Sequence, residues 1–118
     1  MAKYLIINEQ HSLFEEQKVL LGEGYETILI PAEGINFKEI REFQYSHGFK
    51  RGDVIIFASP IPALLMELSK ELWGDNLSSY MEHKYDVLVF HNDKREKKEL
   101  PNGKVVATVA TTGWHLLR

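Results

Sequence analysis

Four polar side chains follow the first apolar run of this sequence at close spacing, namely Asn8, Gln10, His11 and Ser12. Imidazole groups transfer protons near neutral pH, and amide and hydroxyl groups bind phosphate or ribose oxygens. Glutamine has no special role in turns, so Gln10 favours a bound ligand over a simple turn. The alternative is local: Ser12, with Glu15 three residues later, has the spacing of a helix capping box, and His11 then lies on a solvated turn.

A second polar group follows residues 53–58, DVIIFA, whose unbroken apolar run is typical of a strand buried on both faces of a parallel sheet. Ser59 fits the N-cap of the next helix, and Pro60 fits its first helical position. Both residues therefore have a purely structural explanation, yet their place at the end of a strand also suits a ligand. Residues 91–93, His-Asn-Asp, follow a later apolar run in the same way.

Strands and helices alternate along the chain. Apolar runs predict the strands, and helical periodicity with capping residues predicts the helices. The predicted strands cover residues 3–8, 25–31, 53–58 and 85–93, and the predicted helices cover residues 13–21, 59–74 and a segment from Asn36 to about residue 46. Asn102-Gly103 predicts a two-residue hairpin turn with positive φ at both positions, followed by a fifth strand. Residues 111–118 predict a bend and a last short strand.

This order predicts a single α/β domain over residues 1–118, with three layers, a mostly parallel sheet and a C-terminal antiparallel β-ribbon. In such sheets ligands bind beyond the carboxyl ends of the strands, where the strand order reverses. We therefore expect the two polar groups to share one edge of the sheet. Backbone amides and hydroxyl groups there suit a phosphate or a nucleotide ring.

Composition excludes several kinds of site. The 118 residues contain no cysteine, which excludes disulfides, zinc thiolates and cysteine nucleophiles. The net charge of -3 argues against a broad surface for duplex DNA or RNA. No glycine-rich phosphate loop occurs, His47 and His83 lack metal-ligand spacing, and we expect neither a metal nor a cofactor. The N-terminal apolar run is too short for a signal peptide or a membrane span, so we expect no membrane association and a cytoplasmic location.

Three short motifs together resemble one family. N-x-Q-H ends the first strand before a helix opening near SLFEEQ, the third strand leads into FASPIPALLMEL, and the chain closes with LVFHNDKREKKELPNGKVVATVATTGW. They are similar to the signatures of small Rossmann-like proteins that are found with CRISPR systems and on mobile elements. The resemblance extends over most of the chain, although each motif is short. The sequence departs from it at Thr111-Thr112, where such proteins tend to have an Arg-His pair.

The resemblance implies a CARF-like or ring-nuclease-like domain of antiviral defence. Such proteins are homodimers that bind cyclic oligoadenylate second messengers across their two-fold axis, and some cleave them without metal. A ribose 2′-hydroxyl attacks the neighbouring phosphorus and leaves a 2′,3′-cyclic phosphate. By this resemblance His11 is the catalytic acid or base, and Asn8, Gln10, Ser12, Ser59 and Pro60 bind the ligand. We expect Thr112 to be a ligand-binding residue as well, although the resemblance does not extend to it. The departure at Thr111-Thr112 weighs against cleavage more than against binding.

Three functions stay open at this point. The first is a metal-independent ring nuclease, and the second is a non-catalytic sensor or sponge for a cyclic nucleotide. The third is a dimeric interaction module without a small ligand, in which the polarity of residues 8–12 serves only as capping. KREKKE, residues 94–99, mixes both charges and predicts a solvated arm of the hairpin, whose exposed edge allows pairing with another chain.

Overall fold

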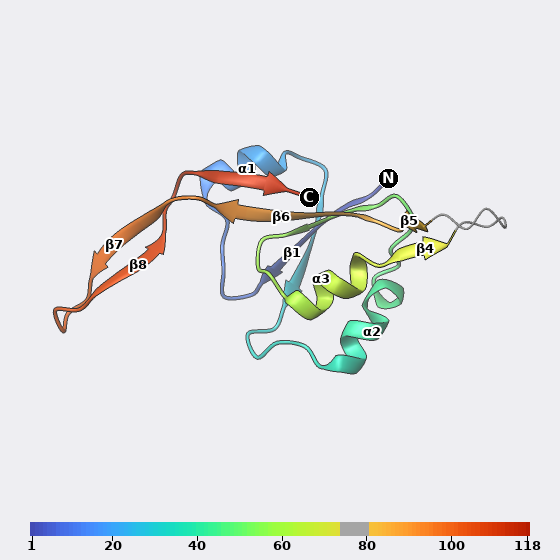
Figure 1. Cartoon of the computed structure of the whole chain (residues 1–118), viewed down its shortest axis with the longest axis horizontal. Helices are drawn as coiled ribbons and strands as arrows, with labels where there is room; N and C mark the ends of the chain where they lie inside the picture. Colours follow the sequence, from blue (N-terminus) through green and yellow to red (C-terminus); the bar gives the residue numbers. More distant parts are fainter. Residues whose placement is uncertain (74–80) are drawn as a thin grey trace.

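The computed structural model describes residues 1–73 and 81–118 and shows an α/β fold built on a five-stranded sheet (Figure 1). The strand order is β2-β1-β3-β6-β9, formed by β1 (Lys3–Asn8), β2 (Glu26–Ile30), β3 (Val54–Phe57), β6 (Asp86–Asn92) and β9 (Trp114–Leu117). β1 pairs in parallel with β2 and β3, β3 pairs in parallel with β6, and β9 runs antiparallel to β6. The predicted α/β class and mostly parallel sheet are therefore confirmed.

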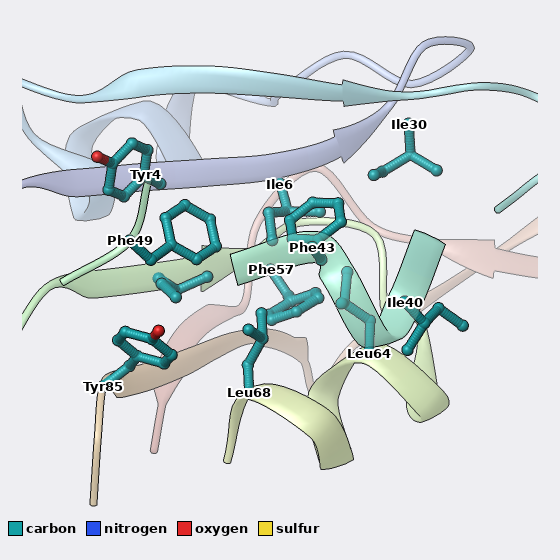
Figure 2. Packing of buried hydrophobic residues seen from close by; sticks show 11 residues of the cluster. Tyr4, Ile6, Ile30, Ile40, Phe43, Phe49, Phe57, Leu64, Leu68 and Tyr85 are labelled. Atoms are coloured by element: carbon teal, nitrogen blue, oxygen red, sulfur yellow. The ribbon is translucent and has the colours of Figure 1, made fainter. Parts of the chain in front are cut away.

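Helices lie against both faces of this sheet, namely α1 (Glu15–Leu21), α2 (Phe37–Ser46) and α3 (Pro62–Leu68). Successive strand residues point to opposite faces, so Leu5 packs in the cluster on the α1 side and Ile6 packs in the cluster on the α2 and α3 side. Figure 2 shows the second cluster, in which Phe57 lies beside Leu64 and Leu68 of α3. In the part of the chain that the structure describes, no helix has the length and apolar character needed to cross a bilayer.

Helix α1 begins later than the capping-box pattern predicted. Its N-cap is Phe14, whose N–H donates to Oε1 of the buried Gln17 at 2.9 Å. Leu13 packs against the cluster on the α1 side, and the ring centroids of Phe14 and Trp114 lie 5.9 Å apart. Burial of these apolar side chains fixes how the chain enters the helix, so the predicted capping box of Ser12 is wrong.

Helix α3 also begins later than predicted, after Ile61, with Pro62 rather than Pro60 at its first position. Its predicted N-cap, Ser59, instead accepts a hydrogen bond from the N–H of Asn8 at the end of β1. The helix ends at Leu68, and the chain then forms a two-stranded antiparallel sheet of β4 (Glu71–Trp73) and β5 (Met81–His83). The predicted helix over 59–74 is therefore too long at both ends. In the sequence a polar segment, residues 75–84, follows the predicted helix, and most of it lies outside the described residues.

A separate antiparallel hairpin of β7 (Arg95–Glu99) and β8 (Val105–Val109) extends away from the sheet (Figure 1). This confirms the predicted ribbon but not its turn. Gly103 N–H donates to the Leu100 carbonyl at 2.9 Å, and Leu100 N–H donates to the Lys104 carbonyl at 2.7 Å. Pro101 suits the second position of a turn over residues 100–103. Gly103, with a φ of 83°, takes the left-handed conformation at the end of this turn. A three-residue loop thus replaces the predicted two-residue turn at Asn102-Gly103.

The base of the hairpin is fastened by the buried Asn92. Asn92 Nδ2 donates to the carbonyls of Thr112 at 2.8 Å and Ala110 at 3.3 Å. The Asp93 N–H donates to the Gly113 carbonyl at 3.0 Å. The start of β9 is thereby held against the end of β6.

Replacement of Gly113 by alanine should destabilise this base. Gly113 has a φ of 83°, which other residues rarely adopt, and an added Cβ would lie 2.8 Å from both Asp93 Oδ1 and Lys94 Cγ. We expect the free energy of unfolding, measured in urea, to fall by about 2 kcal/mol. Gly24 is the matched control, because its φ is 75° and nothing lies within 4 Å of an added Cβ. Gly24→Ala should cost about 1 kcal/mol, and equal losses would show that crowding at Gly113 contributes nothing.

Candidate functional site

The two polar groups of the sequence meet at the carboxyl edge of the sheet. β1, β3 and β6 are parallel, so their carboxyl ends share this edge. β2 lies on one side of β1 and β3 lies on the other, so the strand order reverses between β1 and β3. Ligands of open α/β sheets bind at such a reversal, where the loops from the two strands diverge. The edge between β1 and β3 is therefore the candidate site.

Ser59 lies at the centre of this site. The Ala58 N–H donates to the Ile6 carbonyl at 2.9 Å, which carries the β1–β3 pairing past the end of β3. Ser59 Oγ is thereby placed to accept a hydrogen bond from the Asn8 N–H at 2.9 Å, and it lies 2.7 Å from His11 Nδ1. Ser59 is only 6% exposed, whereas His11 is exposed. A buried hydroxyl group thus holds an exposed imidazole.

The hydroxyl group of Ser59 suits both protonation states of His11. A serine oxygen has one proton to donate and two lone pairs that accept. When His11 Nδ1 lacks a proton the hydroxyl donates to it, and when Nδ1 carries a proton Oγ accepts from it and from the Asn8 N–H together. Among the described residues none hydrogen-bonds His11 Nε2, which is the nitrogen left to exchange a proton with a ligand. Ser59 itself is too deeply buried to act as a nucleophile.

The first loop is the turn of residues 8–12 at the end of β1. Its remaining residues are of two kinds, those that form the turn and those that face solvent. Asn8 Oδ1 accepts from the Gln10 N–H at 2.9 Å, and the Asn8 carbonyl accepts from the His11 N–H at 2.9 Å. Asn8 therefore forms the turn that carries His11. Gln10 and Ser12 are exposed, and no residue in the described ranges hydrogen-bonds their side chains. Their amide and hydroxyl groups are thus open to a ligand.

The other predicted site residues lie further out. Pro60 is exposed and follows Ser59 in the loop before α3. Thr112 lies at the same edge, before β9, but β3 and β6 stand between β9 and β1, and three strand spacings amount to about 14 Å. The structure therefore does not bring Thr112 into the group around Ser59. Glu9, which the sequence prediction omitted, accepts the Ala32 N–H with Oε1 at 2.8 Å and ties the first loop to the end of β2.

A second imidazole group at the same edge involves β6 and β9. His115 Nε2 lies 2.8 Å from Asp93 Oδ2, and this hydrogen bond lowers the pKa of Asp93 below its ordinary value. His91 is directly opposite His115 in the β6–β9 pairing, so the two imidazoles share one face. Even so, residues 1–73 and 81–118 contain no group of three or more histidine and carboxylate side chains arranged to hold a metal ion. The sequence prediction missed the His115–Asp93 pair, because only the β6–β9 register brings these positions together.

Replacement of Ser59 by alanine should loosen the site. The Asn8 N–H would lose its acceptor and His11 would lose the partner of its Nδ1. An unpaired donor in a partly buried place costs about 1–3 kcal/mol, so the free energy of unfolding in urea should fall by about 1–2 kcal/mol. The NMR signals of the His11 ring should also move towards those of a mobile imidazole.

Ser12→Ala is the control for this variant, because Ser12 is an exposed serine of the same loop. Its free energy of unfolding should stay within about 0.5 kcal/mol of the wild-type value. Two variants of equal stability, with an unchanged His11 ring, would contradict the positioning role of Ser59.

The Ser59–His11 pair lines none of the larger hollows of the described surface. The hollow of 470 Å³ lies just past the carboxyl end of β2 and is lined by Pro31, Gly34 and Asn36 among others. One of 320 Å³ lies at the amino end of β6, and one of 190 Å³ lies between β2 and α2. Comparison of the chain with protein-family models, with curated proteins and with solved structures finds no match.

Proposed function

We propose that this protein binds a cyclic oligoadenylate at the carboxyl edge of its sheet and cleaves it without a metal ion, as a ring nuclease in the cytoplasm. The observation that carries the proposal is the Ser59–His11 pair, a buried hydroxyl group that orients an exposed imidazole where the strand order reverses. The order of the parallel strands, β2-β1-β3-β6, supports a three-layer Rossmann-like fold, in which nucleotides bind at this position.

The proposed reaction needs one activated hydroxyl group and one correctly held phosphodiester. The ribose 2′-oxygen forms a bond to the adjacent phosphorus, and the bond from phosphorus to the 5′-oxygen breaks. His11 Nε2 takes the proton of the 2′-hydroxyl, and the departing 5′-oxygen takes a proton from water. Nδ1 donates to Ser59 Oγ throughout, which keeps Nε2 directed at the ligand. The products are a 2′,3′-cyclic phosphate and a 5′-hydroxyl.

Neutral donors in the first loop would hold the phosphate. Gln10 and Ser12 flank His11, and both side chains are exposed. Their N–H and O–H groups would donate to the non-bridging oxygens, on which negative charge builds up as the 2′-oxygen attacks. The same contacts would align the 2′-oxygen with the bond that breaks, which supplies much of the rate in such reactions.

A non-catalytic sensor or sponge is the second candidate function. The observation that favours it is that His11 has no carboxylate partner among the described residues: the imidazole–carboxylate pair of this edge, His115–Asp93, lies on β9 and just after β6. That pair is distant from the first loop, and the carboxylate of the loop itself, Glu9, accepts the Ala32 N–H instead of bonding to His11. Such a protein would bind the cyclic nucleotide through Asn8, Gln10 and Ser12 and release it unchanged.

The test is to incubate the purified protein with cyclic tri-, tetra- and hexa-adenylate in EDTA and to follow melting temperature and products together. Linear products ending in a cyclic phosphate support the nuclease. A higher melting temperature without products supports the sensor or sponge. If none of the three rings raises the melting temperature or gives products, both functions are contradicted. The dimeric interaction module then remains.

A further inference from the structure

The outer edge of β8 has no partner strand in the described part of the chain. β7 and β8 pair only with each other and form a two-stranded sheet apart from the five-stranded one (Figure 1). Three valines of β8 are exposed, with 62% for Val105, 36% for Val106 and 43% for Val109. An isolated two-stranded hairpin is only marginally stable in water, and further strands are needed to stabilise it. The hairpin therefore has both a free edge and a reason to pair.

The hydrogen bonds of the hairpin show which backbone groups are free. Leu100 and Lys104 form a hydrogen-bonded pair at its end, and in antiparallel strands such pairs alternate with pairs that are not bonded. The next residues of β8 towards its base that bond to β7 are Val106 and Thr108. The N–H and C=O groups of the alternate residues of β8 point away from β7, namely those of Val105, Ala107 and Val109.

We propose that β8 pairs antiparallel with β8 of a second copy of this chain, about a two-fold axis at Ala107. This register places Ala107 opposite Ala107 and Val105 opposite Val109 of the second copy, so every outward N–H and C=O group of β8 gains a partner. Val106 then faces Thr108. β-branched residues opposite one another stabilise antiparallel strands, and the segment VVATV forms such pairs with itself.

The charged strand β7 is suited to be an edge strand of the paired ribbon. All five of its residues, REKKE, are charged and exposed, and charged side chains are the usual protection of a sheet edge against further pairing. Pairing through β8 produces a four-stranded ribbon in which both copies of β7 are the edges. Pairing through β7 would also join opposite charges, such as Arg95 with Glu99, but exposed ion pairs contribute little and Lys97 would face itself.

The pairing also brings the two carboxyl edges towards each other. β8 runs from the hairpin tip to its base, so in the antiparallel pair the tip of each hairpin lies beside the base of the other. Lys104 of one copy is then level with Ala110 of the second, next to Thr111 and Thr112. The dimer thus places a cationic side chain of each copy at the edge that carries the candidate site of the other, although the interface itself does not depend on any ligand.

A pair of proline variants tests the interface. Ala107→Pro removes an outward N–H of β8, and Lys97→Pro removes the outward N–H directly opposite on β7, while both leave the hydrogen bonds within the hairpin intact. The dimer dissociation constant, measured by analytical ultracentrifugation of the full chain, should rise about 100-fold or more for Ala107→Pro, which removes hydrogen bonds from both copies. It should be unchanged for Lys97→Pro. A monomeric wild-type protein, a dimeric Ala107→Pro variant or a monomeric Lys97→Pro variant would overturn the proposal.

Cysteine cross-linking tests the same register without loss of the dimer. The chain has no cysteine, so Ala107→Cys introduces a single thiol. Residues of a hydrogen-bonded antiparallel pair have Cα atoms about 5.5 Å apart, which lies within the range for a disulfide. Ala107→Cys should form a covalent dimer under mild oxidation at low protein concentration, and Lys97→Cys should not. Cross-linking of Lys97→Cys alone would place the interface on β7 instead.

Discussion

Replacement of His11 by alanine is expected to lower the rate of cyclic oligoadenylate cleavage by about 100- to 10,000-fold, the usual contribution of one acid–base group. The loss follows because no other titratable side chain of the described residues bonds to the Ser59 hydroxyl. His11 is exposed, so its removal should change the free energy of unfolding by less than about 1 kcal/mol. Rates would be measured by single-turnover product formation in EDTA, with the melting temperature recorded for each variant.

His91→Ala is the matched control for this variant. His91 is an exposed histidine of the same sheet edge, but it lies on β6 opposite His115 and not in the first loop. It should cleave at the wild-type rate, and Ser59→Ala should fall between the two because Ser59 acts through His11. A His11→Ala variant that still gains melting temperature with the ligand but forms no product separates catalysis from binding. A fully active His11→Ala variant would contradict the proposed mechanism.

The elements of the fold were predictable wherever the decisive contacts are local. The apolar runs alternate with amphipathic segments, and each of the predicted strands lies within a residue or so of an observed one. The start of α2 was also local: Asn36 Oδ1 accepts from the Glu39 N–H at 2.8 Å, as the spacing of the two residues indicated. Such features depend on neighbours in sequence, which a single chain displays directly.

The starts of α1 and α3 were predicted wrongly because distant residues decide them. Ser59 was an acceptable N-cap by type, but its hydroxyl accepts from the Asn8 N–H, 51 residues away. Pro62 offers the same fixed φ as Pro60, so the helix could begin at either proline without any change in local pattern. Burial of Leu13 and Phe14 displaced the other start in the same manner.

Part of the candidate site could be predicted from the residues that end each strand, and part of it depends on distant contacts. Asn8, His11 and Ser59 were named from the ends of two strands, and the parallel pairing of β1 with β3 brings these ends together. The hydrogen bond between Ser59 and His11 could not be foreseen, because capping was an equally good use of the serine. Thr112 stayed apart because β9 is the far edge strand of the sheet.

Replacement of Phe57 by alanine should destabilise the whole domain more than any surface change considered above. Phe57 is fully buried in β3, between β1 and β6, and packs against α3 through Leu64 and Leu68 (Figure 2). Phenylalanine-to-alanine changes at such positions cost about 3–5 kcal/mol, because the cavity they leave collapses only in part. Domains of this size are stable by about 5–15 kcal/mol, so the loss is a large share of the total. Urea unfolding followed by tryptophan fluorescence would measure it.

Phe37→Ala is the matched control, because Phe37 is 71% exposed and the guanidinium of Arg41 lies over its ring, 5.6 Å from the ring centroid. It should cost less than about 1 kcal/mol, as exposed positions generally do. The Phe57 variant should also disturb His11, because Phe57 is followed directly by Ala58 and Ser59, whose bonds to Ile6 and Asn8 hold the site. A loss below about 1 kcal/mol for Phe57→Ala would contradict the central place of β3 in the sheet, and with it the placement of Ser59 beside β1.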